Sequence, residues 1–127
     1  MRVLICGGRK FDDLELLTEA LDLIDDANNI TVVIHGAAKG ADELGGLWGE
    51  ISNKQVLAFP ADWEKYGRKS AGPIRNQQMI DEGYPEVIIA FPGGSGTYDM
   101  KIRGRQNDIF VVEVKRKNNE IVLREFI

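Results

Sequence analysis

Cysteine and histidine are the rarest chemically versatile residues of this chain, with one of each among 127 residues. A single cysteine excludes a disulfide bond within the chain. One histidine with one cysteine argues against a structural zinc site, and we expect neither a metal nor a cofactor. No apolar run approaches the roughly 20 residues of a membrane-spanning helix. The apolar start, 2–6, ends in glycine and charge, which predicts a strand rather than a signal peptide and hence a cytoplasmic protein.

Positive charge is also in short supply, with 16 Lys and Arg against 20 Asp and Glu and a net charge of −4 at pH 7. Non-specific nucleic-acid binding normally needs a basic face, so nucleic acid is not the partner we expect. The acids concentrate in segment 12–26, whereas the predicted loops are locally basic. This pattern favours a small phosphorylated ligand. The loop cations are Arg9, Lys10, Lys39, Lys65, Arg68, Lys69 and Arg75.

Apolar, β-rich runs alternate with helical segments along the chain. The runs cover 2–6, 31–34, 55–59, 86–91 and 109–114, and the helices about 12–26, 44–51, 73–82 and 97–105. Such alternation predicts an α/β fold, a Rossmann-like three-layer α/β/α arrangement with a mostly parallel sheet of about five strands. A turn at Asn118-Asn119 predicts a hairpin that adds an antiparallel edge strand, 121–126. We expect residues 1–127 to form one domain.

Two apolar stripes predict the core-facing sides of the first two helices. They consist of Leu14, Leu17, Leu21 and Ile24, and of Leu44, Leu47, Trp48 and Ile51. Residues 60–72 show no such pattern and predict an irregular loop, longer than the roughly 2–6 residues usual between a strand and a helix. Pro73 would then start the third helix.

The stretch after the fourth strand predicts a phosphate-binding loop. Its glycines allow a close approach of backbone to a ligand, and the following helix presents free backbone N–H groups that favour an anion. The predicted loop comprises Pro92, Gly93, Gly94, Ser95, Gly96 and Thr97. Asp99 follows it, as a carboxylate base or ribose contact, or as an acid that complements the helix dipole.

Three further loops should meet the phosphate loop, because ligands of open α/β sheets bind outside the carboxyl ends of the strands. After the second strand, Gly36 and Gly40 permit tight backbone, and Asp42 caps a helix or contacts a ligand hydroxyl. His35 there is a general base or a hydrogen-bonded packing residue. After the first strand, Gly8 precedes Arg9.

Arginines and aromatic residues supply the remaining candidate ligand contacts. Arg9 is a phosphate clamp or a surface residue. Arg75 would lie in the first turn of the third helix, where it opposes the helix dipole, which favours a ligand role beside Asn76. Trp63 and Tyr66 either stack on a base or anchor their loop to the core.

These segments together resemble the SLOG superfamily of Rossmann-like nucleotide-binding proteins, in its small single-domain branch related to YspA. The resembling segments are 8–12, 35–42, 60–67, 71–79 and 90–100, so that the likeness covers about residues 2–114 in order. The resemblance implies a nucleotide or nucleotide-derived ligand and a homodimer or homotetramer. The final hairpin strand has no part in it.

Within that superfamily the chain is similar to the "lonely guy" phosphoribohydrolases, which release the base from nucleoside 5′-monophosphates. Pro92 to Thr97 match their Pro-Gly-Gly-x-Gly-Thr-x-x-Glu motif, and Arg75 matches the arginine of their Arg-Lys-x-x-Met segment. Met100 stands where they have the catalytic glutamate, with Asp99 one position earlier, and Asn76 replaces the lysine. The phosphate and ribose cradle is therefore implied, but the hydrolytic carboxylate is not.

Three functions stay open on these residues. The chain binds a nucleotide, as a sensor or sequestering module. Alternatively it is a hydrolase, a nucleotide N-glycosidase that uses Asp99. The third alternative is single-stranded nucleic-acid binding, as in a recombination-mediator branch of the superfamily, which the acidic balance disfavours.

Overall fold

The computed structural model describes all 127 residues as six strands and four helices in one α/β arrangement. The strands are β1 (Arg2–Cys6), β2 (Val32–His35), β3 (Gln55–Ala58), β4 (Val87–Ala90), β5 (Phe110–Lys117) and β6 (Glu120–Glu125). The helices are α1 (Leu14–Asn28), α2 (Ala41–Ile51), α3 (Trp63–Gly83) and α4 (Ser95–Gln106). The predicted Rossmann-like fold with a C-terminal antiparallel strand is confirmed.

The strands form one sheet in the order β3-β2-β1-β4-β5-β6, parallel except for β6. From β1 the chain moves outward through β2 and β3, and then returns to place β4 on the other side of β1. The order of strands therefore reverses between β1 and β4. Chain segments that leave the carboxyl ends of these two strands diverge, and a crevice opens between them.

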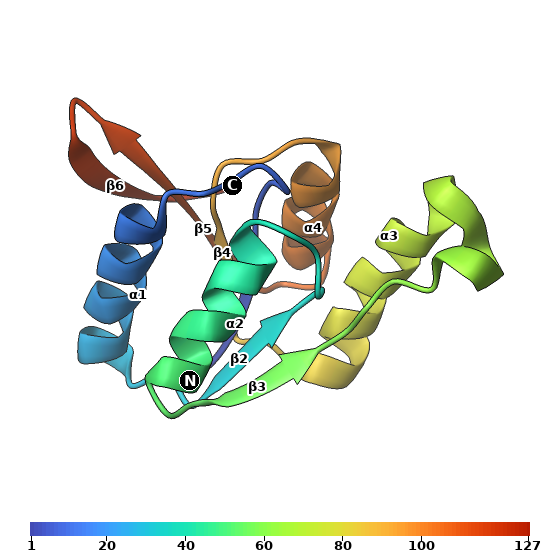
Figure 1. Ribbon diagram of the computed structural model, residues 1–127, viewed down its shortest axis with the longest axis horizontal. Helices are drawn as coiled ribbons and strands as arrows, with labels where there is room; N and C mark the ends of the chain where they lie inside the picture. Colours follow the sequence, from blue (N-terminus) through green and yellow to red (C-terminus); the bar gives the residue numbers. More distant parts are fainter.

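The helices cover the two faces of the sheet in pairs (Figure 1). Helices α1 and α2 pack on one face of the sheet, where they form a core with strand residues such as Val3 and Ile5. Helices α3 and α4 pack on the other face, where Met79 and Met100 join Leu4 in a second core. None of the four helices combines the length and apolar character that a transmembrane segment requires.

Helix α3 begins ten residues earlier than the sequence predicted. The segment expected to be an irregular loop, 60–72, is helical from Trp63, where Asp62 caps the helix by accepting a hydrogen bond from the Lys65 N–H at 3.0 Å. Gly67, at φ 77° and ψ 177°, breaks the helix into two parts. Residues 62–70 are all exposed, so no apolar stripe marks the first part in the sequence. Figure 1 shows this part projecting from the body of the protein.

The side of helix α2 that faces the sheet is formed by glycines, so the predicted apolar stripe of this helix was partly wrong. A Cβ on Gly45 would stand 2.8 Å from Ile5, and one on Gly49 would stand 2.9 Å from Val56. The helix lies so close to the strands that only glycine fits at these positions. The larger Leu47 and Ile51 lie on other sides of the helix and are 45% and 76% exposed.

The stripe of α1 is shifted in a similar way. Leu17 and Leu21 are fully buried as predicted, but Leu14 is 48% exposed. Leu16 and Ala20 take the remaining core positions. The N-terminal end of the helix is capped by Asp13, whose carboxylate is also bound by Arg116 of β5 at 2.9 Å.

Candidate functional site

A cleft of about 370 Å³ lies at the carboxyl ends of the strands, beside the point where the strand order reverses. It is bounded by the loop after β1, the start of α2, the middle of α3 and the start of α4. Of the predicted site residues, the cleft contains Arg9, Asp42, Trp63, Arg75, Asn76, Ser95, Gly96, Thr97 and Asp99. It is also lined by Arg68, one of the predicted loop cations, and by residues that the sequence did not single out for the site, namely Cys6, Gly7, Ala38, Gly72, Pro73, Met79 and Met100.

Interlocked main chain joins the loops that surround the cleft. The Gly8 N–H donates to the Pro92 carbonyl at 2.9 Å, and the Gly8 carbonyl accepts from Ala41 N–H at 3.2 Å. A Cβ on Gly40, which has φ 81°, would collide with that same Gly8 carbonyl. A Cβ on Gly93 would stand 2.7 Å from the Gly8 nitrogen. These glycines thus pack three loops together beside the cleft and do not line it.

The N-terminal end of α4 opens onto the cleft without a side-chain cap. Gly94 is the N-cap residue and supplies no side-chain hydrogen bond. The backbone N–H groups of Ser95, Gly96 and Thr97 belong to the first turn, which has no partners within its own helix. Nothing approaches within 4 Å of a Cβ built on Gly96, so the helix end is accessible from the cleft. Pro92 is exposed and does not line the cleft.

Arg75 lies well inside α3, so the predicted conflict with the helix dipole does not arise. Its Nη1 donates to the carbonyls of Gly36 and Phe59, and its Nε donates to Asn76 Oδ1 at 3.2 Å. A Cβ on Gly36 would overlap the guanidinium, which explains the glycine there. Burial lowers the pKa of Arg75 and Arg9 acts in the same direction, whereas nearby Asp42 opposes the shift. Arg75 therefore ties the β2 loop to α3 and presents its remaining edge to the cleft.

Asp42 braces the loop after β2 from the first turn of α2. Its Oδ2 accepts hydrogen bonds from the backbone N–H groups of Gly36 at 2.9 Å and Ala38 at 3.3 Å, so it is not the helix cap that the sequence suggested. The residue is 6% exposed. Burial raises the pKa of its carboxyl group, while the two N–H groups, Arg75 and Arg9 act in the opposite direction.

His35 is packed beneath the neighbouring loop and is not brought to the cleft. Its Nδ1 accepts a hydrogen bond from the Ala37 N–H at 2.9 Å, which leaves the proton of the neutral ring on Nε2. Nε2 faces α2, where a Cβ on Gly46 would stand 2.8 Å away. Burial lowers the pKa of His35, Glu50 raises it and Arg75 lowers it. The position is that of a hydrogen-bonded packing residue.

A polar network holds Asp99 at the cleft wall. Asn76, 5% exposed, donates from Nδ2 to Asp99 Oδ2 at 2.9 Å and to the Gly96 carbonyl at 3.3 Å. Arg103 donates from Nε to the same Asp99 oxygen at 2.8 Å, and from Nη1 to Gln77. Both partners use Oδ2, so Oδ1 of Asp99 accepts from no protein donor. The network ties α3 to the first turns of α4.

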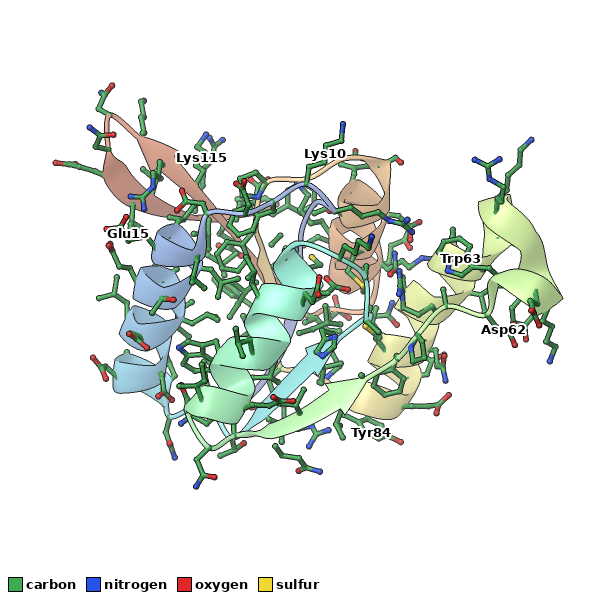
Figure 2. The ribbon with its side chains drawn as sticks, in the orientation of Figure 1. Lys10, Glu15, Asp62, Trp63, Tyr84 and Lys115 are labelled. Carbon is green, nitrogen blue, oxygen red and sulfur yellow. The ribbon has the colours of Figure 1, made fainter.

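The mouth of the cleft is basic and aromatic. The Arg9 guanidinium lies 5.4 Å from the centre of the Trp63 ring, within the range of a cation–π contact. Arg68, one residue after the break in α3, lines the same part of the cleft. Trp63 is 44% exposed, so it does not anchor its segment in the core. Figure 2 shows it on the side of α3 that faces the body, whereas Asp62 points outward.

Tyr66 lies apart from this cleft, in a groove of about 710 Å³ on the outer side of α3. The groove is larger than the cleft, but it is lined mainly by polar side chains such as Gln78, Asp81 and Glu82 and includes no part of the glycine loop. Lys65 lies over the Tyr66 ring at 5.1 Å. We therefore place the candidate site in the smaller cleft, where the strand ends converge.

Comparisons with known proteins agree with this geometry. The family described as "YspA, cpYpsA-related SLOG family" matches residues 1–66. The "Gene 61 protein" of Mycobacterium phage D29 is 38% identical over 99 residues, which cover 73% of this chain and 78% of that protein. The chain belongs to the YspA, cpYpsA-related SLOG family.

A solved structure shares the fold of this SLOG protein. DNA processing protein A (DprA) from Streptococcus pneumoniae matches 92% of the chain with a TM-score of 0.73 and 15% sequence identity. The present chain covers 51% of that protein, about half of its length. At this level of identity the likeness concerns the fold alone.

The apolar wall of the SLOG cleft includes the position at which the resemblance placed a catalytic glutamate. Met100 is 1% exposed and packs with Met79 and Cys6 on the α3 and α4 face of the sheet. Burial, and next the nearby Asp42, raise the pKa of the Cys6 thiol, so it stays protonated and unreactive. Asp99, Asp42 and Cys6 do not gather into a metal site, since no group of three or more His, Cys, Asp or Glu side chains is placed to hold an ion.

Proposed function

We propose that this SLOG protein binds a small phosphorylated ligand, a nucleotide or a nucleotide derivative, in the cleft between α3 and the starts of α2 and α4. The observation that carries the proposal is the uncapped, open N-terminal end of α4, with arginines around it in the same cleft. Backbone N–H groups and the helix dipole at such an end favour an anion. Family membership supports the same ligand class.

Each part of the cleft fits a different part of such a ligand. A phosphate group would accept hydrogen bonds from the first-turn N–H groups of α4, 95–97, while Arg9 and Arg68 neutralise its charge. The free Oδ1 of Asp99 would accept from a ribose hydroxyl. Trp63 offers a ring for stacking, and Arg9 already covers one side of it.

The biological role that follows from binding without turnover is sensing or sequestering a nucleotide. Binding is favoured over catalysis because the glutamate position of the related hydrolases holds buried Met100. In keeping with this, Asp99 is held in place by hydrogen bonds from two donors, Asn76 and Arg103.

One observation favours N-glycosidase activity as a second candidate. Asp99 is a carboxylate on the wall of the cleft with an oxygen, Oδ1, left without a protein donor. As the base leaves with the electron pair of the N-glycosidic bond, positive charge develops on the ribose, and a carboxylate there stabilises it until water adds to the anomeric carbon. Loss of base release in Asp99→Asn, with binding retained, would identify this activity.

Single-stranded nucleic-acid binding is the weakest of the three proposals. The name of the structurally similar protein refers to DNA processing, but the net charge of −4 opposes binding to a polyanion. A filter-binding titration at low salt with a labelled oligonucleotide tests this proposal, and retention at micromolar protein would support it.

The deciding experiment measures binding and turnover on the same samples. The protein is incubated with nucleoside monophosphates, NAD and ADP-ribose; released base is followed by chromatography and the melting temperature by thermal shift. A rise in melting temperature with every nucleotide intact supports a binding module. If no nucleotide shifts the melting temperature or loses its base, the proposal is wrong.

Variants sharpen this test. Arg9→Gln and Arg68→Gln remove cleft cations and should weaken binding of phosphorylated ligands by about tenfold each, as expected for a charge-assisted hydrogen bond. Lys10→Gln is the matched control, because Lys10 lies outside the cleft and projects away from Trp63 in Figure 2. Equal losses in all three variants would point to general electrostatic attraction instead of a site.

A further inference from the structure

Strand β6 forms one edge of the sheet, and no other element lies outside it (Figure 1). It pairs with β5 along its whole length, from Val112↔Glu125 to Lys117↔Glu120, without a bulge. Its centre, Ile121-Val122-Leu123, is apolar, and the strand contains no proline, glycine or lysine. Edge strands that avoid pairing with another chain usually carry such residues or a bulge. This edge therefore lacks proline, lysine and a bulge, and its only protective residues are the charged Glu120, Arg124 and Glu125.

The two faces of β6 differ in character. Ile121 packs against the core on the α1 side, and Leu123 lies opposite Val114 of that core, so both belong to this face. Leu123 is still 42% exposed.

The other face of β6 is charged. Alternation along the strand places Glu120, Val122 and Arg124 on the α3 and α4 side of the sheet. Neither Glu120 nor Arg124 is a partner in the ion pairs of the monomer. Within the hairpin Glu120 lies opposite Lys117 and Arg124 lies opposite Glu113, but neither makes an ion pair there, so both can pair with another chain.

We propose that two copies of this chain associate edge to edge, with β6 of one copy antiparallel to β6 of the other and Val122 on the two-fold axis. A two-fold axis perpendicular to the sheet keeps like faces together. Glu120 of each copy then lies directly opposite Arg124 of the other, and Ile121 lies opposite Leu123. The dimer therefore gains two ion pairs on one face and two apolar pairs on the other.

The neighbouring symmetric registers are poorer. Centring the pair on Ile121 sets Glu120 against Val122, which leaves the charge opposite an apolar side chain. Centring it on Leu123 sets Ile121 against Glu125 and Val122 against Arg124. Only the register centred on Val122 sets opposite charges against each other and apolar side chains against each other. The sequence of β6 therefore favours one register between the two copies.

This surface is separate from the nucleotide cleft and from the residues that match the family. The family match ends at residue 66, and the hairpin spans Phe110–Glu125. The pairing would join two six-stranded sheets into one continuous sheet of twelve strands, with a cleft in each half.

Sedimentation velocity over a roughly hundredfold range of protein concentration tests the dimer by mass action. Glu120→Arg places arginine opposite Arg124 of the second copy, and Arg124→Glu places glutamate opposite Glu120, so each variant should weaken dimerisation by about tenfold or more. The double variant restores opposite charges between the copies and should recover most of the lost affinity, the remainder reflecting like charges opposite Lys117 and Glu113 within each hairpin. Glu82→Arg, on α3 away from this edge, is the charge-reversal control and should leave it unchanged.

Hydrogen exchange provides a second readout that does not depend on the variants. The β6 amides should become more protected as the protein concentration rises, while those of α3 do not. A monomer at all concentrations would overturn the proposal. So would a dimer that the two single variants leave intact, because that dimer must use a different surface.

Discussion

Asn76 on α3 donates a hydrogen bond to the Asp99 carboxylate on α4 across 2.9 Å, and this contact joins the two helices at the wall of the cleft. The same amide group also reaches the Gly96 carbonyl in the first turn of α4. Asn76 thereby sets the position of the helix end to which a phosphate would bind.

Asn76→Asp should lower both stability and ligand affinity. The new carboxylate would face Asp99 with like charge and lose both donated hydrogen bonds, at a cost of about 1–3 kcal/mol in the free energy of unfolding. Urea denaturation measures the stability and thermal shift measures the ligand effect. Gln78→Glu makes the same chemical change on the same helix and should cost little, because the Gln78 side chain makes no hydrogen bond in the protein. Equal effects would contradict the role given to Asn76.

Two substitutions of Asp42 should have opposite effects at neutral pH. Asp42→Ala leaves the Gly36 and Ala38 N–H groups without their acceptor, which should cost about 1–3 kcal/mol. Asp42→Asn retains an acceptor oxygen and removes a buried charge. Because the folded pKa is raised above 3.8, the stabilising contribution of the carboxyl group is complete below that pH and is lost as pH rises through the raised value. Asp42→Asn should therefore be more stable than the wild type at pH 7, with the difference shrinking toward acid.

His35 should produce a pH dependence of the opposite sign. Its folded pKa is lowered from 6.5, so its stabilising contribution is present above pH 6.5 and is lost as pH falls through the lowered pKa. His35→Asn keeps an acceptor for the Ala37 N–H but cannot take up a proton. The loss of stability below pH 6.5 should therefore be smaller in His35→Asn than in the wild type. Denaturant titrations on both sides of this pH measure it, and parallel curves would show that His35 does not titrate on unfolding.

Two glycine-to-alanine substitutions should distinguish a glycine that packs the loops together from a glycine at the open end of α4. Gly40→Ala places a Cβ on the Gly8 carbonyl at a φ of 81°, which should cost on the order of 1–3 kcal/mol for the backbone conformation alone. Gly96→Ala meets no neighbour within 4 Å and should leave the stability equal or higher, since alanine is favoured in helices. Its methyl group stands at the open helix end, so nucleotide affinity should fall. Unchanged affinity in Gly96→Ala would remove α4 from the proposed phosphate site.

The strands and their order of appearance could be predicted because each is a nearly continuous apolar run between glycine or polar turns. β1 was predicted at its observed bounds, and the other strands within a few residues, except that β5 continues through the charged segment 115–117. Those charges lie on an exposed hairpin, where a strand needs no apolar residues.

The first half of α3 could not be predicted from hydrophobic periodicity. Its residues are exposed all round, and Gly67, Gly72 and Pro73 are all residues that disfavour a helix. Arg68 was therefore predicted to be a loop cation, although it lies in helix α3 and lines the mouth of the cleft. The position of Arg75 in the first turn was wrong for the same reason, because α3 begins at Trp63, whereas its place at the ligand cleft stays a prediction.

The candidate cleft was located by the rule for strand ends, but the orientation of single side chains was not. His35 ends β2 and Asp42 lies in the first turn of α2, yet His35 packs against α2 whereas Asp42 lines the cleft. Their separation depends on Gly46 and Gly36, which leave room for the imidazole and for Arg75 respectively. Such steric fits between distant residues are not visible in the linear sequence.

The loops around the cleft are joined through main chain, at Gly8, Gly40 and Gly93, and this divides the site into a fixed part and an adjustable part. Backbone atoms keep their shape whatever side chains surround them. The residues at the mouth, Arg9, Trp63 and Arg68, are exposed and can be exchanged without disturbing the packing beneath. A change of ligand preference, by evolution or by engineering, is therefore open to this chain through its rim, while the anion cradle stays as it is.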